Sequence, residues 1–366
     1  MKKAFLLLFV SLLILVSCEQ KDTTEIDAII NKAIDDHVFP GAVLIVGNSE
    51  SVIYQKAYGH FTYDSLSQNV SLNSIFDLAS LSKVFGTGMC LMKAIDSGLV
   101  DPEAYMVDYL PEMNNHGKDS IKIKHLLMHI SGMHSYSQKG KTPEETWDII
   151  SNLSLPRAVG EYKYSCLNFI TLMKVLESVT NEAMWKFYRD VYTEPMGLEN
   201  TMYSPSQEYQ ENCLPTIGDS SGTKIKLQGK VHDPLALSLE GYSGNAGLFS
   251  TGPDLAKLCQ LMMNKGNFDG KKYVTEETWS KFVTQQHGSR SWAWGMNNYK
   301  GSSAGSKLKE TAFGHTGYTG TCAWLDTKQD IFIVFLTNRV YPRDQKAVSP
   351  TRRAVNDAVV DAFIGS

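Results

Sequence analysis

The stretch Phe76-Asp77-Leu78-Ala79-Ser80-Leu81-Ser82-Lys83 contains a serine and a lysine, Ser80 and Lys83, whose spacing indicates a reactive pair. Its tetrad Ser80-Leu81-Ser82-Lys83 opens an apolar run with helical periodicity, which we expect to extend from about Ser80 to Ile95 and to close at Gly98. A serine and a lysine three positions apart on a helix share one face, so the amine can reach the hydroxyl. A lysine whose pKa is lowered by burial can take the serine proton, and backbone N–H groups at the helix start can stabilise an oxyanion. The spacing therefore favours Ser80 as a nucleophile and Lys83 as its base.

On the tetrad alone there is a simpler alternative, in which Ser80 caps the helix and Lys83 is exposed to solvent. The chain also contains a second copy of the pattern, Ser221-Gly222-Thr223-Lys224. That copy lies in a polar stretch where nothing fixes the pair or excludes water, so we do not treat it as a site. The choice for Ser80 depends on the motifs that accompany it.

Two further motifs follow along the chain. Tyr164-Ser165-Cys166 comes just before a helix-like segment, residues 168–178, and a tyrosine that points into a cleft can move a proton when cations lie nearby. The third motif, His315-Thr316-Gly317, precedes a strand-like run, and a glycine there lets a substrate backbone approach the strand edge. Taken singly, each has a structural alternative: one packed tyrosine among 17, and an ordinary turn.

Together and in this order, the three motifs resemble those of the serine β-lactamase and penicillin-binding-protein superfamily. That pattern is Ser-x-x-Lys, then Tyr-x-Asn or Ser-x-Asn, then Lys-Thr-Gly. The separations resemble those of the class C and esterase-like branch. So do three flanking stretches, which are Phe76–Ala79, Leu126–Gly132 and Gly244–Thr251. The resemblance covers roughly residues 26–363.

The resemblance implies an acyl-enzyme mechanism without a metal or an organic cofactor. Ser80 would attack a carbonyl while Lys83 and Tyr164 move protons, and the backbone N–H groups of Ser80 and Tyr318 would form the oxyanion hole. Water would then release the acyl group. The residues that we expect to bind the substrate are His315, Thr316, Gly317, Tyr318, Cys166 and, as described next, Arg339.

The chain departs from the family pattern at two positions. Cys166 stands where the family usually has Asn, and a thiol is a poor substitute for an amide that orients the lysine and a substrate amide. His315 stands in place of Lys, so a permanent cation is replaced by a group that titrates near neutrality. Arg339, just after a strand-like run, can supply the missing contact to a substrate carboxylate; the alternative is a solvated surface arginine.

These departures favour a serine hydrolase that cleaves an ester or amide bond, with a D-amino-acid-containing or cell-wall-derived peptide or a small ester as substrate. A class C-type β-lactamase is one alternative. A non-catalytic or single-turnover penicillin-binding sensor or scaffold is another, and Cys166 is the residue that motivates it.

The first residues resemble an export signal. Lys2 and Lys3 precede an apolar run that is too short to span a bilayer, and the run ends in Leu15-Val16-Ser17-Cys18, which resembles a bacterial lipobox. We expect residues 1–17 to be a lipoprotein signal peptide, Cys18 to carry lipid and residues 18–25 to form a tether. The expected location is the cell envelope, facing the periplasm and anchored to a membrane through Cys18. A plain secretory signal with an incidental cysteine is the alternative.

Composition limits the remaining possibilities. The chain has 366 residues, 43% hydrophobic and 20% charged, and its net charge of −4 argues against nucleic acid, which needs a clustered basic face. With Cys18 lipidated, an odd number of the six cysteines remains, and we expect most of those to be small buried thiols. His125, His129 and His134 suggest a metal site by their spacing, but no carboxylate follows in a zincin arrangement, so we expect none.

The order of the expected elements indicates an α+β fold. Residues 42–47 and 51–58 form a candidate antiparallel hairpin after a helix over residues 26–34. Beyond the helix that starts near Ser80, another helix begins at Thr142, and runs at 321–326 and 331–337 precede a final helix after Pro350. Strands at both ends of the chain imply one antiparallel sheet, flanked by the terminal helices, with a mainly helical lobe inserted. We place the domain at residues 26–366, with a sheet lobe over about 26–120 and 231–366 and a helical lobe over about 121–230. Residues 204–230 are expected to be a long surface loop.

Overall fold

The computed structural model describes residues 21–220, 224–344 and 346–365. The expected signal segment, the lipidation site Cys18 and the residues Ser221, Gly222 and Thr223 of the second tetrad lie outside the described residues. Within the described part of the chain, no helix is both long and apolar enough to cross a membrane.

In the described residues, the main sheet has six strands in the order β10-β11-β12-β13-β1-β2, and every neighbouring pair is antiparallel. The strands are β1 (Gly41–Gly47), β2 (Val52–Gly59), β10 (Gly295–Met296), β11 (Phe313–Thr316), β12 (Cys322–Asp326) and β13 (Ile331–Thr337). The expected hairpin is confirmed, and β1 pairs on its other edge with β13, with Ala42 opposite Thr337. The α+β class with one sheet assembled from the two ends of the chain is therefore confirmed.

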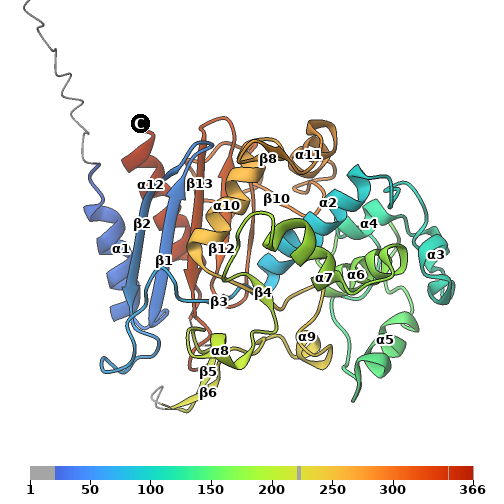
Figure 1. Cartoon of the computed structure of the whole chain (residues 1–366), viewed down its shortest axis with the longest axis horizontal. Coiled ribbons are helices and arrows are strands. Elements are labelled where there is room, and N and C mark those ends of the chain that lie inside the picture. Colours follow the sequence, from blue (N-terminus) through green and yellow to red (C-terminus); the bar gives the residue numbers. More distant parts are fainter. Residues whose placement is uncertain (1–20, 221–223, 345, 366) are drawn as a thin grey trace, which may run out of the picture.

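Helices cover both faces of this sheet. The terminal helices α1 (Thr24–Asp35) and α12 (Ser349–Phe363) lie together over one face, where an apolar cluster fills the interface. The helix α10 (Gly252–Met263) packs against β1 and β13 on the opposite face. Figure 1 shows this layered part, including α10, at the left, and α2 to α7, α9 and α11 gathered at the right.

The segment between β2 and β10 is mainly helical. Its helices are α2 (Met89–Asp96), α3 (Met106–Tyr109), α4 (Ile123–Leu127), α5 (Pro143–Ser151), α6 (Cys166–Thr180), α7 (Met184–Tyr188), α8 (Gln207–Gln210), α9 (Pro234–Ser238), α10 and α11 (Glu276–Val283), with short turns η3 (Pro111–Met113), η4 (Lys118–Ser120) and η5 (Arg189–Thr193). Short strands lie between these helices. One small sheet contains β3 (Phe76–Asp77), β4 (Met202–Tyr203) and β7 (Leu248–Ser250). One two-stranded ribbon pairs β5 (Ile217–Gly218) with β6 (Ile225–Leu227), and a second pairs β8 (Asn267–Phe268) with β9 (Lys271–Lys272). The expected helix start at Thr142 is confirmed, since its side chain accepts from the Glu145 N–H.

The expectation of an irregular loop over residues 204–230 is wrong in its details. The segment contains α8 and the ribbon of β5 and β6, and the Ile75 N–H and carbonyl pair with the chain on either side of Cys213. Cys213 itself is buried. The segment therefore has a small apolar anchor that its polar composition concealed.

The helix expected from Ser80 to Ile95 is continuous but not regular. It begins with a tight turn, η1 (Ala79–Leu81), continues as a π-helix, η2 (Lys83–Gly88), and becomes α-helical only in α2. Glycines in the wide turn allow close contacts, because a Cβ atom on Gly86 would lie 2.2 Å from Tyr203 Oη. A π-helical turn within a helix occurs frequently at functional sites.

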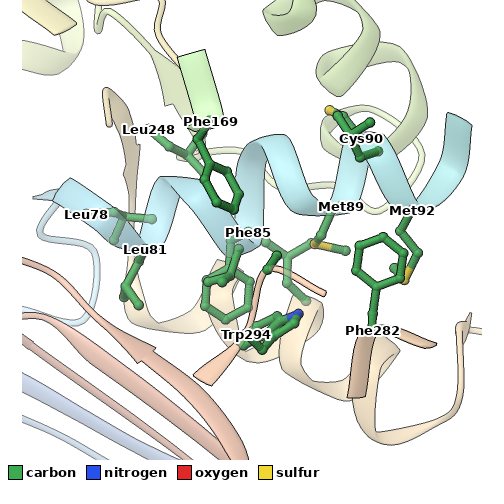
Figure 2. Close-up of a cluster of buried hydrophobic side chains, with 14 of the residues drawn as sticks. Leu78, Leu81, Phe85, Met89, Cys90, Met92, Phe169, Leu248, Phe282 and Trp294 are labelled. Carbon is green, nitrogen blue, oxygen red and sulfur yellow. The ribbon is translucent and has the colours of Figure 1, made fainter. Parts of the chain in front are cut away.

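This helix passes through the centre of the larger apolar core. Leu81, Phe85 and Met89 project from it into a cluster that also holds Trp294 and Phe282 (Figure 2). The Phe85 and Trp294 rings meet edge to face with centroids 5.2 Å apart. Packing around Phe85 thus holds the helix that carries Ser80 and Lys83.

We expect Phe85→Ala to lower the free energy of unfolding by about 3–5 kcal/mol, because it removes a fully buried ring and leaves a cavity. Denaturant titration followed by circular dichroism measures this change. Ile53→Ala is the matched control, since Ile53 is 41% exposed on β2 and its truncation should cost about 0.5 kcal/mol or less. Equal effects of the two substitutions would contradict this account of the core.

Candidate active site

The segment that carries Ser80 is held by a buried carboxylate and by two hydroxyls. Asp77 accepts hydrogen bonds from the N–H groups of Ala79, at 2.8 Å, and His232, at 2.7 Å. Thr319 donates to the Asp77 carbonyl and Thr321 to the Leu78 carbonyl. These contacts fix Ala79 in a left-handed conformation with φ of 47°, which is unfavourable for a residue with a Cβ. The backbone strain lies directly before Ser80.

Lys83 is completely buried and donates in three directions. Its Nζ lies 3.1 Å from Ser80 Oγ, 3.6 Å from Cys166 Sγ and 2.7 Å from the Asn245 carbonyl oxygen. A protonated lysine has three N–H donors and no acceptor, so this arrangement satisfies an ammonium group in full. The structure thus brings Ser80, Lys83 and Cys166 together, as the motifs predicted.

The expectation that burial leaves Lys83 with a lowered pKa is wrong. Burial does work to lower the pKa of Lys83, but the negative charges that Cys166 and Tyr164 acquire on deprotonation outweigh it, with help from Asp233. The net direction is upward from the ordinary value, which agrees with the three donated hydrogen bonds. This direction is consistent with an ammonium group beside Ser80; the motifs had named Cys166 and Tyr164, and the contribution of Asp233 is the part that sequence reasoning missed.

A turn formed by residues 243–247 supplies the oxygen that completes the lysine site. Gly244 leaves no room for a side chain, because a Cβ atom there would lie 1.9 Å from the Phe169 carbonyl oxygen. The Gly244 carbonyl accepts from Thr87, and the next carbonyl, that of Asn245, accepts from Lys83. The flanking stretch that resembles the family in sequence thus has a defined structural task.

Tyr164 lies between two cations and two imidazoles. Lys83 Nζ is 5.2 Å from the centre of its ring, and the guanidinium of Arg290 is 5.8 Å from it. The rings of His129 and His315 lie 4.5 and 5.9 Å away, centroid to centroid. Tyr164 therefore lies beside Lys83 and Arg290, where a phenol can take part in proton transfer.

His315 is a neutral residue in this site. Burial first, and then the nearby positive charges of Arg290 and Lys83, hold the pKa of its imidazole well below the ordinary value. Its Nδ1 lies 2.9 Å from the Thr316 carbonyl oxygen, a contact that requires a proton on Nδ1. Thr316 follows at the end of β11 and lines the same cleft.

Gly317 is required by the protein itself. A Cβ atom at this position would lie 2.1 Å from Thr321 Oγ1 and 2.5 Å from the Leu78 carbonyl oxygen. The close approach is thus to the backbone that precedes Ser80. Packing within the protein is thus enough to explain the glycine at position 317, and its expected role in admitting a substrate backbone stays a prediction.

Arg352, which sequence reasoning missed, holds the turn between β11 and β12. It is buried, and its guanidinium donates to the carbonyl oxygens of Gly317 at 2.6 Å, Gly320 at 3.1 Å and Thr321 at 2.9 Å. A signal was available, because Arg352 falls on the apolar face of the final helix, three positions before Val355. An arginine on the buried face of a helix indicates that its guanidinium binds buried polar groups.

Arg339 and Tyr318 form part of the cleft wall. Arg339 donates to the Tyr318 and Lys346 carbonyl oxygens and pairs with Asp344, which also accepts from Tyr318 Oη. Tyr318 is 54% exposed at the mouth of the cleft. Arg339 is thus already engaged with a carboxylate, which leaves it fewer donors for a substrate.

The cleft has a volume of about 620 Å³, and its lining includes Ser80, Tyr164 and His315 to Gly317, while Lys83 and Cys166 lie behind this lining. Its charged residues are unbalanced: Arg290, Arg339 and Arg352 face a single carboxylate, that of Asp344. Arg290 donates to Tyr162 Oη at 2.7 and 3.2 Å, and its Nη1 is buried with no hydrogen-bond partner among the described residues. Nothing in the sequence around Arg290 indicated this placement, since only the fold brings it beside Tyr164.

The histidines that suggested a metal do not form a ligand set. Among the described residues there is no group of three or more His, Cys, Asp or Glu side chains that could hold a metal ion. His125 Nδ1 accepts from the Lys122 N–H, and the His134 carbonyl accepts from Ser165 Oγ. The five cysteines of the described chain are all free, and Cys166 is the one among them that is not fully buried.

The ionisation of Asp77 should make stability depend on pH. Burial raises its pKa from 3.8 to about 6, although the His232 and Ala79 N–H groups favour the charged form. Because the folded-state pKa is above the unfolded one, the contribution of Asp77 is greatest below about pH 4 and is lost as the pH rises through 6. Between those limits the loss is about 3 kcal/mol.

We therefore expect the difference in unfolding free energy between the native chain and Asp77→Asn to decrease by about this amount from pH 4 to pH 7. Denaturant titrations of both proteins at several pH values measure it. A difference that does not change with pH would contradict the assignment.

Comparisons with known proteins agree with this geometry. The family model described as "Beta-lactamase" matches residues 26–357. A Bacillus subtilis (strain 168) protein named N-acetylmuramyl-L-alanine amidase is 30% identical over 349 residues, which is 82% of this chain and 77% of that protein. A relative from Escherichia coli O157:H7, which carries the provisional name of a D-alanyl-D-alanine carboxypeptidase, is 27% identical over 83% of this chain and 79% of its own.

Solved structures show the same fold at low sequence identity. A penicillin-binding-protein homologue from Caulobacter crescentus superposes with a TM-score of 0.77 at 16% identity, over 93% of this chain and 97% of that one. EstCE1, a hydrolase with promiscuous acyltransferase activity, superposes with a TM-score of 0.74 at 19% identity, over 92% of this chain and 98% of its own.

Proposed function

The chain belongs to the β-lactamase family, and from that premise we propose that it hydrolyses an ester or amide bond through an acyl-enzyme formed on Ser80. The observation that carries this proposal is the contact of 3.1 Å between the buried Lys83 Nζ and Ser80 Oγ at the wall of the cleft. Tyr164, whose ring centre lies 5.2 Å from Lys83 Nζ, supplies the second proton-transfer group.

In the proposed first step, Ser80 Oγ attacks the substrate carbonyl carbon and loses its proton to the Lys83–Tyr164 pair. Since Lys83 already carries its proton, we assign acceptance of the new one to Tyr164, because the cations Lys83 and Arg290 both lie beside its ring. The same proton then goes to the leaving oxygen or nitrogen as its bond to the carbonyl carbon breaks. Water repeats the attack on the acyl-enzyme and releases the acid.

The oxyanion of each tetrahedral intermediate needs fixed donors. We assign this task to the backbone N–H groups of Ser80 and Tyr318. Arg352 supports one side of this arrangement, because it binds the carbonyls of the turn that contains Tyr318, and Asp77 supports the other side through Ala79. Neither group touches the substrate in this scheme.

The charge of the cleft favours a substrate with a carboxylate near the bond that is cleaved. Three arginines face one carboxylate, and Arg290 is the cation that lowers the pKa of His315 most, at the position where the family has lysine. A peptide that ends in a D-amino acid, or another cell-wall-derived peptide, has such a carboxylate. The amidase and carboxypeptidase names of the two relatives support this class, and the esterase-like structure keeps a small ester as a further candidate.

We also propose that the protein is a lipoprotein of the cell envelope, anchored through Cys18 and facing the periplasm. The support for this is the pattern of Lys2, Lys3, the apolar run and the lipobox-like Leu15-Val16-Ser17-Cys18. A cell-wall-derived substrate would be accessible at that location.

The acyl-enzyme predicts covalent labelling at one residue. A fluorophosphonate or a labelled penicillin should acylate Ser80 in the native chain, and Ser80→Ala should abolish the labelling. Hydrolysis of p-nitrophenyl esters or D-aminoacyl peptides should fall roughly 1000-fold or more in Ser80→Ala and Lys83→Ala. Ser82→Ala is the matched control from the same tetrad and should still label. Equal labelling of the native chain and Ser80→Ala would contradict the proposal, and labelling without turnover would favour a single-turnover binder.

Cys166 should disfavour β-lactams. We expect slow or no hydrolysis of nitrocefin by the native chain, because a thiol cannot donate to and accept from a substrate amide as an Asn does. Cys166→Asn should raise the rate of acylation by penicillin about tenfold, which corresponds to one added hydrogen bond. Cys166→Ser, of similar size but without an amide, should not. Equal rates for the two variants would contradict this role of Cys166.

A further inference from the structure

His129 holds the chain on both sides of Tyr164. Its carbonyl oxygen accepts from the Lys163 N–H at 2.9 Å, and its Nδ1 accepts from the Ser165 N–H at 3.1 Å. One residue thus fixes the backbone immediately before and immediately after the tyrosine. His129 is 1% exposed and has φ of 58°, so its own backbone is also held in an unusual conformation.

The His129 side chain also supports the Tyr164 ring. The two rings lie 4.5 Å apart, centroid to centroid, with planes inclined at 35°, and Phe169 supports the far side of the imidazole at 5.2 Å. The face of Tyr164 is thereby fixed relative to Lys83 and Arg290, whose charges lie 5.2 and 5.8 Å from its centre. A small rotation of the phenol would change both distances.

The hydrogen bonds specify one form of the imidazole. Because Nδ1 accepts from a backbone N–H, the proton of a neutral ring must be on Nε2. Asn168 supports this form, since its amide nitrogen lies 3.5 Å from Nδ1 while its oxygen accepts from Ser131. Burial, followed by the charges of Arg290, Lys83 and His315, holds the pKa of His129 well below its ordinary value, so the ring stays neutral.

Nε2 of His129 is buried and has no hydrogen-bond partner among the described residues. A buried donor without a partner costs stability, typically about 1–3 kcal/mol. An apolar ring would avoid this cost but would leave the Ser165 N–H without its acceptor. The two bonds to the neighbours of Tyr164 are therefore the contacts that indicate a task at the active site.

We propose that His129 is the positioning residue of Tyr164, which sets the orientation of the phenol between Lys83 and Arg290 by holding residues 163 and 165 and by stacking on the ring. The proposal rests on the proposed function, since it assigns His129 to the reaction of Ser80. His129 does not touch the substrate and is not a catalytic residue.

The test compares two substitutions at His129. His129→Asn keeps a side-chain acceptor at nearly the same distance from the backbone as Nδ1, and Asn tolerates positive φ, but the stacking ring is lost. His129→Ala loses the acceptor and the ring. The rate of Ser80 acylation by a fluorophosphonate and the kcat and KM for a p-nitrophenyl ester are measured for each, over a range of pH.

We expect acylation to fall about tenfold in His129→Asn and roughly 100-fold in His129→Ala, with kcat reduced and KM little changed, because a displaced catalytic group is a loss of orientation. The alkaline limb of the pH profile, to which Lys83 contributes, should move to lower pH, because a displaced Tyr164 raises the pKa of Lys83 less. His125→Asn and His125→Ala are the matched controls, since His125 Nδ1 accepts a backbone N–H in the same way, at Lys122, and should leave the rate unchanged.

Folded His129 variants that acylate at the native rate with the native pH profile would overturn the proposal. If the native chain itself does not react with the fluorophosphonate, the proposed function fails before the role of His129 is tested. Imidazole ¹⁵N shifts of the native chain provide a measurement that does not depend on the variants. They should show His129 neutral from pH 5 to 8 with its proton on Nε2, and a charged ring or a proton on Nδ1 would overturn the assignment.

Discussion

The contact on which the site depends is the ammonium group of Lys83. It is completely buried, and its three donors reach Ser80 in the same helix, Cys166 at the start of α6 and the carbonyl of Asn245 before β7. A buried charge is costly unless it is paired and fully hydrogen-bonded, so these three segments are constrained to meet at one point. Two glycines allow these segments to come together. Gly86, in the π-helical turn, lies against Tyr203, and Gly244 lies against the Phe169 carbonyl, so that a Cβ atom at either position would clash.

The positive charge at the centre of the site determines the ionisation of the groups around it. His129 and His315 are both held neutral by burial and by the charges of Arg290 and Lys83, so the imidazoles act as hydrogen-bonding and stacking groups. Tyr164, placed between two cations and two neutral rings, is the group best placed to carry the transferred proton. The excess of arginine over carboxylate in the cleft is the feature that supports the proposed anionic substrate.

Local patterns in the sequence predicted the parts of this structure that depend on local physics. The hairpin of β1 and β2, the capped helix α5 and the final helix α12 follow from periodicity and turn residues, and the tetrad placed Lys83 within reach of Ser80 because helical spacing is fixed. Three features depended on residues far apart in the chain. They are the raised pKa of Lys83, the clamp formed by Arg352 and the placement of Arg290. No single segment contains the partners that produce them. Helix propensity also does not anticipate the irregular turns from Ala79 to Gly88, where Gly86 lies against Tyr203.

The charge of Lys83 is the central claim, and it can be measured directly. The ¹³Cε chemical shift of Lys83, assigned with a Lys83→Arg variant and followed through a pH titration of the native chain, reports its protonation. We expect Lys83 to be protonated at pH 7 and to lose its proton only above the ordinary lysine pKa of 10.5. A Lys83 that is neutral at pH 7 would instead be the base for Ser80 itself, against the role assigned to Tyr164.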